Sequence, residues 1–145
     1  MSVAKFLNEE EEKSILEAIR LAEKNTSGEI RVHLESNCEE DVLERAQKVF
    51  KQLKMHKTKL RNGVLFYVAT ESQHFAILGD NGIDKKVSSN FWDEAKEIVI
   101  SHLKKNQKAE GLEAGILKAG EQLKSFFPYK SDDENELSDE ISTGK

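Results

Sequence analysis

The chain has 145 residues, enough for one domain of ordinary size with a hydrophobic core. Its 37% hydrophobic and 34% charged residues are typical of a small soluble domain, and no apolar run approaches the roughly 18 residues that span a bilayer. The single cysteine, Cys38, excludes an internal disulfide bond, and the acidic N-terminal segment does not fit a secretory signal. We therefore expect a cytoplasmic monomer without membrane insertion.

The net charge of −5 is concentrated at the C-terminal end of the chain. Residues 131–145 carry six acidic side chains and one lysine, whereas the preceding residues carry equal numbers of acidic and basic side chains. A neutral body with an acidic tail argues against nucleic-acid binding. We expect one α/β domain over residues 1–130 and a disordered, dispensable tail over residues 131–145. The tail is also a candidate contact for a basic protein partner.

The first half of the body predicts a helix, a strand and a second helix. Asn8 and Glu11 fit a helix start, and apolar residues then recur at helical spacing up to about Asn25. Residues 29–35 alternate between apolar and polar side chains, which indicates a strand with one buried face. A polar loop leads to a second amphipathic helix that begins at Asp41.

Two strands and two helices complete the predicted domain. Residues 64–69 form the longest apolar run, and residues 75–78 follow after a polar turn, which predicts an antiparallel hairpin. A third helix is expected from about residue 90 to 106, and a fourth from about residue 109 to 126, before Pro128. The sheet residues expected to be buried include Ile30, Val32, Leu34, Val64, Phe66, Val68, Ala76 and Leu78.

This order of elements predicts a three-layer α/β/α fold, with a small mixed sheet covered by helices. A helical crossover between the first strand and the hairpin makes those two strands parallel. Their starts, residues 27–29 and 61–63, therefore meet at one edge of the sheet, and the hairpin returns residues 79–82 to the same edge. On the fourth helix, Gly111 and Gly115 share a face, which lets a neighbouring element approach closely.

This shared edge is the predicted functional site. Asp80, Asn81 and Asp84 form a short stretch of oxygen-bearing side chains, which are the ligands that calcium and magnesium prefer. A plain turn, capped by its own Asp and Asn side chains, is the alternative. We predict that Glu29, Asn62 and Asp80 bind a divalent cation with modest affinity, and that Asp84 is a further ligand.

The remaining polar residues carry weaker signals. Arg61 and Lys59 stand beside the predicted site and could hold a phosphate group by charge, although such basic loops are more often simply solvated. The sequence contains no phosphate-cradling loop and no nucleophile elbow. Four histidines show no metal-ligand spacing, so we expect surface or half-buried roles for His33, His56, His74 and His102.

Three segments meet at the predicted edge: Thr26-Ser27-Gly28-Glu29-Ile30, Asn62-Gly63-Val64-Leu65 and Gly79-Asp80-Asn81-Gly82-Ile83-Asp84. Their order and spacing resemble the TPM domain family, named for a thylakoid lumen protein, a photosystem II repair protein and a nicotinic-receptor modulator. The resemblance covers roughly residues 8–127. It implies an α/β/α fold, a divalent-cation site at this edge, and a phosphatase activity that is attributed to the chloroplast members.

The chain departs from much of the family in two ways. Many relatives carry a signal peptide and a membrane helix, and many have an acid where this chain has Asn62. Two functions follow. The first is a cation-binding accessory or partner-binding module. The alternative is a metal-assisted phosphomonoesterase, with Asp80 as ligand or base and Arg61 as a charge clamp.

Overall fold

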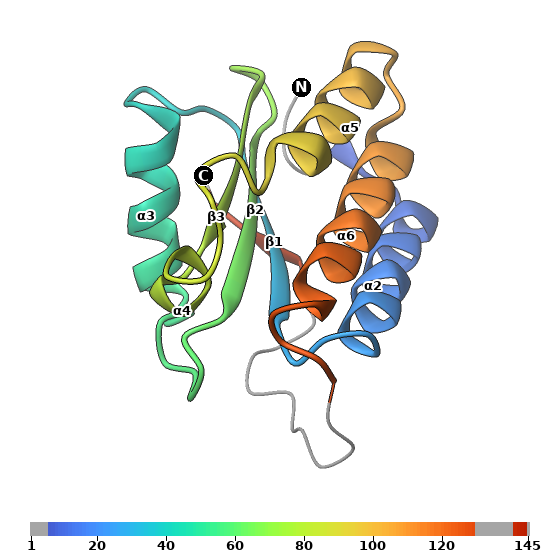
Figure 1. Cartoon of the computed structure of the whole chain (residues 1–145). Coiled ribbons are helices and arrows are strands. Elements are labelled where there is room, and N and C mark those ends of the chain that lie inside the picture. Colours follow the sequence, from blue (N-terminus) through green and yellow to red (C-terminus); the bar gives the residue numbers. More distant parts are fainter. Residues whose placement is uncertain (1–5, 130–140, 145) are drawn as a thin grey trace.

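A computed structural model describes residues 6–129 and 141–144 of the chain. Figure 1 shows three layers: a sheet lies between α3 on one face and α2, α5 and α6 on the other. The predicted three-layer α/β/α fold is therefore confirmed. The described elements are α2 (Glu9–Glu23), β1 (Glu29–Glu35), α3 (Val42–Gln52), β2 (Gly63–Ala69), β3 (His74–Gly79), α4 (Asn81–Asp84), α5 (Asp93–Lys104), α6 (Lys108–Lys124) and β4 (Ile141–Thr143).

The helices begin and pack largely as the sequence predicts. Asn8 caps α2 in a reciprocal arrangement with Glu11, and Asp41 caps α3. α6 approaches α5 closely at Gly115, where an added Cβ atom would stand 2.4 Å from Val99 Cγ2. This close approach was predicted from the glycine spacing. Within the described ranges, we find no helix with the length and apolar character needed to cross a membrane.

The sheet has the strand order β3-β2-β1-β4. β1 and β2 run parallel, with Glu29 opposite Gly63, and β2 and β3 form an antiparallel hairpin, with Val64 opposite Gly79. Both pairings agree with the prediction. α4, a single helical turn after β3, was expected only as a loop or turn.

β4 corrects the expectation of a disordered tail. Ile141 to Thr143 pair in parallel with β1, with Ile141 opposite Val32. The strand covers backbone groups of β1 that would otherwise form an open sheet edge, and Ile141 packs against the core. The prediction of disorder is therefore wrong for residues 141–144, and residues 131–140 and 145 lie outside the described residues.

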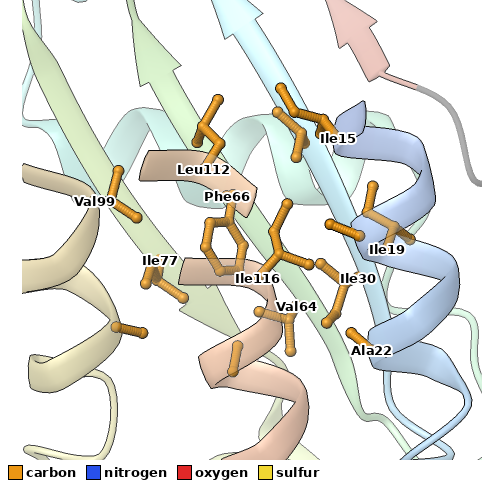
Figure 2. Packing of buried hydrophobic residues seen from close by; sticks show 14 of the residues in the cluster. Ile15, Ile19, Ala22, Ile30, Val64, Phe66, Ile77, Val99, Leu112 and Ile116 are labelled. Carbon is orange, nitrogen blue, oxygen red and sulfur yellow. The ribbon is translucent and has the colours of Figure 1, made fainter. Parts of the chain in front are cut away.

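The core has one part on each face of the sheet. The larger part joins β1, β2 and β3 to α2, α5 and α6 through residues such as Phe66, Ile116 and Ile19 (Figure 2). The smaller part packs Leu65 and Tyr67 against α3. Burial of both faces explains the unbroken apolar run of β2. Every sheet residue predicted to be buried is buried, except that Leu78 is only partly so.

The prediction for β1 needs one correction, because its polar face is not solvated. Glu29, His33 and Glu35 are all buried, so His33 is not the surface or half-buried residue that was expected. On this face only Arg31 is partly exposed. Buried charges of this kind are costly unless hydrogen bonds or ion pairs satisfy them.

Candidate functional site at one edge of the sheet

The three predicted segments meet at one edge of the sheet. The backbone N–H of Glu29 donates to the carbonyl of Asn62 at 3.3 Å, and the N–H of Asp80 donates to the carbonyl of Gly63 at 3.0 Å. The starts of β1 and β2 and the end of β3 therefore lie side by side. α4 follows directly and lies near the C-terminal end of α3 (Figure 1).

Asp80 has the best-defined surroundings of the predicted site residues. Its side chain caps α4 by accepting a hydrogen bond from the N–H of Asn81 at 2.8 Å. It also accepts two hydrogen bonds from Arg61, from Nε at 2.8 Å and Nη2 at 3.0 Å. The bond to Asp80 raises the pKa of Arg61, whose side chain is 44% exposed. The self-capping role that the alternative interpretation predicted is thus present, together with an ion pair.

Gly82 holds α4 against the loop that carries Arg61. Its N–H donates to the carbonyl of Arg61 at 2.8 Å. An added Cβ atom would lie 2.1 Å from the carbonyl oxygen of Leu60 and 2.5 Å from that of Arg61. These neighbours are backbone atoms, so no side chain fits without moving the chain.

We expect Gly82→Ala to lower the free energy of unfolding by at least about 2 kcal/mol, because the methyl group must push α4 away from the loop. Thermal unfolding should show a fall of about 5 °C or more in the melting temperature. Asn81→Ala is the matched control, because the Asn81 side chain is exposed on the same turn. An unchanged melting temperature for Gly82→Ala would mean that the loop yields freely.

A pocket of about 490 Å³ opens between α3 and the α4 edge. The edge contributes Arg61, Asp80, Asn81 and Asp84, and α3 contributes Glu44, Gln47, Lys48 and Lys51. The pocket thus carries carboxylate, amide and cationic groups. Carboxylate and amide oxygens are suited to a hard cation, whereas the lysines and Arg61 are suited to an anion such as phosphate.

The structure divides the four predicted ligands into two pairs. Asp80 and Asp84 both line the pocket, and burial together with the charge of Asp80 raises the pKa of Asp84. Glu29 and Asn62 are buried at the same edge but do not line the pocket. The amide of Asn62 instead donates to Ser27 Oγ at 3.5 Å. Among residues 6–129 and 141–144, no group of three or more His, Cys, Asp or Glu side chains is arranged to hold a metal ion.

A second polar cluster, which was not predicted, lies on the α3 face of β1. Glu35 accepts hydrogen bonds from Tyr67 Oη at 2.5 Å and from Arg45 Nε at 2.9 Å, and it pairs with Arg45 Nη2 as well. His33 Nε2 lies 3.3 Å from Glu35 Oε1. Burial alone would raise the pKa of Glu35, but the hydrogen bonds from Arg45 and Tyr67 outweigh it and hold the pKa at about 2. The cluster is a buried carboxylate with its charge compensated.

Comparisons with known proteins agree with this fold. A family model described as the TPM domain matches residues 1–122. The chain is 52% identical to the BA42 protein from the psychrophilic bacterium Bizionia argentinensis, whose NMR structure superposes with a TM-score of 0.92 over 99% of each chain. The NMR structure of the N-terminal domain of a P. gingivalis protein gives a TM-score of 0.70 at 19% identity, over 87% of this chain and 82% of that one. At this identity the second similarity shows the fold alone.

A search of curated proteins gives no match. The family model nevertheless spans most of the chain, and its range contains all three motifs that suggested the resemblance. The chain belongs to the TPM domain family.

Proposed function

We propose that this TPM domain binds a divalent cation, calcium or magnesium, in the pocket beside α4, as an accessory or partner-binding module. The observation that carries the proposal is the convergence of two carboxylates, Asp80 and Asp84, on one pocket, with the amide of Asn81 beside them. Hard cations take such oxygen ligands and complete their coordination with water.

Glu29 is the candidate third carboxylate. β1 alternates, with Ile30 on the face toward α6, so Glu29 belongs to the opposite face, the one that α3 covers. Asp80 follows β3 one position beyond the pair Val64–Gly79, which places it across from Gly63, itself the partner of Glu29. Because Gly63 has no side chain, nothing on β2 separates the two carboxylates on this face. Asn62, directly before β2, offers an uncharged amide oxygen. An acidic residue at the same position would add a negative charge to the site.

Arg61 sets the affinity of the proposed site. Its guanidinium holds both oxygens of Asp80, so a cation must compete with it for that carboxylate. The Arg61 side chain is 44% exposed and can move into water at low cost. We therefore expect a dissociation constant of about 10⁻⁴ to 10⁻³ M, as for weak calcium modules.

The alternative function is a metal-assisted phosphomonoesterase at the same pocket. The observation that favours it is the row of cationic groups, Arg61, Lys48 and Lys51, that lines the pocket together with the carboxylates. A bound cation would polarise the phosphoryl group. The residues of the chain would do the rest: Arg61 and the lysines would hold the phosphate oxygens, and Asp80 would accept a proton from the attacking water.

A backbone chemical-shift titration with calcium and magnesium chloride tests the proposal. We expect shifts concentrated at residues 26–29, 61–63 and 79–84 that saturate at millimolar cation. Asp80→Asn should abolish them, whereas Asp93→Asn, an exposed acid at the start of α5, should leave them unchanged. Arg61→Gln should tighten binding about two- to fivefold, because it removes the competitor of the cation.

Three outcomes would count against this function. Shifts confined to residues 35–41 and 71, at the opposite edge of the sheet, would make the site assignment wrong. No response at millimolar cation would overturn cation binding itself. If Arg61→Gln did not tighten binding, Asp80 would not be a ligand. Turnover of a generic phosphomonoester that is lost in Asp80→Asn and Arg61→Gln would favour the esterase over the binding module.

A further inference from the structure

The outer edge of β1 binds the C-terminal segment through side chains as well as backbone. Ser142 Oγ lies 2.8 Å from Nδ1 of His33 and 3.3 Å from the carbonyl oxygen of Val32. The hydroxyl donates to the carbonyl, which leaves its lone pairs to accept from Nδ1–H of the imidazole. The edge therefore accepts a hydroxyl residue at the position beside His33.

The contact that Gly144 makes with the edge of β1 leaves little room for a side chain at this position. The N–H of Gly144 donates to the carbonyl of Leu34 at 2.7 Å. An added Cβ atom at Gly144 would lie 2.6 Å from Glu35 Oε1 and 3.0 Å from His33 Nε2. Because Arg45 and Tyr67 hold the Glu35 side chain, a side chain at position 144 would have to displace it. The edge therefore favours a segment that carries a hydroxyl residue followed two positions later by glycine.

β4 is a short strand. It has three residues, of which Ile141 and Ser142 are partly buried and Thr143 is exposed. A short edge strand of this kind has little docking free energy of its own, so a change in a single contacting group can release it.

The docked segment covers His33, which bonds to it through one ring nitrogen. With Nδ1–H bonded to Ser142, Nε2 of the uncharged ring has no hydrogen-bond partner, and Glu35 Oε1, 3.3 Å away, could accept from it only in the charged ring. The ring is 5% exposed and stacks on Tyr67 of β2, with ring centroids 6.0 Å apart. A second proton would put a cation into a site that already contains the guanidinium of Arg45.

We propose that residues 141–144 form a releasable strand, and that protonation of His33 releases it from the edge of β1. Among the described residues, the charged and titratable groups around His33 are Arg31 and Glu35 on β1, Tyr67 on β2 and Arg45 on α3. Glu35 favours the imidazolium, but it already accepts hydrogen bonds from Arg45 and Tyr67. Burial has the largest effect and opposes the charge, and the positive charges of Arg45 and Arg31 oppose it further.

The direction of the pH dependence follows from this balance. Burial holds the pKa of docked His33 below its ordinary value of 6.5, and release of β4 returns the ring to water. Docking is therefore strongest above pH 6.5 and weakens as the pH falls through that value, until the pKa of the docked state is passed. Each unit between the two pKa values shifts the docking equilibrium about tenfold. Glu35 stays ionised throughout, because its pKa is about 2.

Amide protection and histidine titration by NMR on the full chain test the proposal. At pH 8 the amide of Gly144 should be protected. Between pH 8 and 5 its protection factor should fall about tenfold for each unit by which the pKa of His33 is lower in the docked state than in the released state. The amide of Phe66, in the fully buried strand β2, should keep its protection over the same range.

Two variants of the full chain complete the test. Gly144→Val should prevent docking, because its side chain would have to displace Glu35 from its partners, so its C-terminal segment should be unprotected at every pH and the pKa of His33 should rise toward 6.5. Thr143→Ala changes an exposed side chain of the same strand and should behave like the parent chain. An unprotected Gly144 at pH 8 would overturn docking. Constant protection while His33 titrates, or an unchanged pKa of His33 in Gly144→Val, would overturn control by His33.

Discussion

Val68→Asp should lower the free energy of unfolding by more than about 4 kcal/mol, the largest effect that we expect from a single substitution in this chain. Val68 is 3% exposed on β2, opposite Phe75 of β3, and it faces the larger part of the core. An aspartate there would lose its hydration and gain no described cation in exchange. Chemical denaturation followed by circular dichroism at neutral pH measures the change.

Leu43→Asp is the control for this experiment. It makes a comparable apolar-to-acid change, but Leu43 is 50% exposed at the start of α3, where a negative charge is favourable. We expect a change within about 0.5 kcal/mol. If Val68→Asp kept the denaturation midpoint of the parent chain, β2 would not be the centre of the core.

The central hairpin and the convergent edge could be predicted because their signals are local. The apolar run of residues 64–69, the polar turn after it and the glycines at its ends are all visible in the sequence. One topological rule, the parallel crossover, then brings Glu29 and Asp80 to the same edge. The convergence of Asp80 and Asp84 on one pocket follows from a single short motif and a one-turn helix.

The buried cluster around Glu35 could not be predicted in the same way. Alternating residues in β1 suggested a solvated polar face, which is typical of antiparallel sheets, but β1 is a central parallel strand that is covered on both faces. The partners of Glu35 come from other elements, Arg45 from α3 and Tyr67 from β2. The available signal was the fold class itself, since helices cover both faces of a central strand in an α/β/α sheet.

β4 and the pairing of Arg61 with Asp80 depend on tertiary packing in the same way. Residues 141–143 contain one large apolar side chain in an acidic context, which gives no strand signal of its own. The strand forms because the edge of β1 presents His33 and the Leu34 carbonyl to it. Arg61 was considered as a phosphate clamp, and its bidentate pairing with Asp80 depends on Gly82 bringing the two segments together.

Glu35→Gln should lower the free energy of unfolding by about 3 kcal/mol at neutral pH. In the parent chain the carboxylate has a pKa of about 2 instead of 4.5, a difference that corresponds to about 3 kcal/mol. Its side chain is 2% exposed, so solvent screens this interaction little. A glutamine keeps one acceptor oxygen, but its NH₂ group must face donors on Arg45 and Tyr67, which leaves a donor without an acceptor.

The pH dependence separates this charge effect from a packing effect. Because the folded-state pKa of Glu35 is lowered, its stabilisation is fully present above pH 4.5 and is lost as the pH falls toward 2. The parent chain should therefore lose stability steeply over this range in urea denaturation, and Glu35→Gln should lose less. Glu17→Gln, which breaks an exposed pair with Arg20, should cost no more than about 0.5 kcal/mol and keep the steep slope. Equal slopes for the parent chain and Glu35→Gln would show that the ionised carboxylate does not stabilise the fold, and that the loss at neutral pH comes from packing around Tyr67 alone.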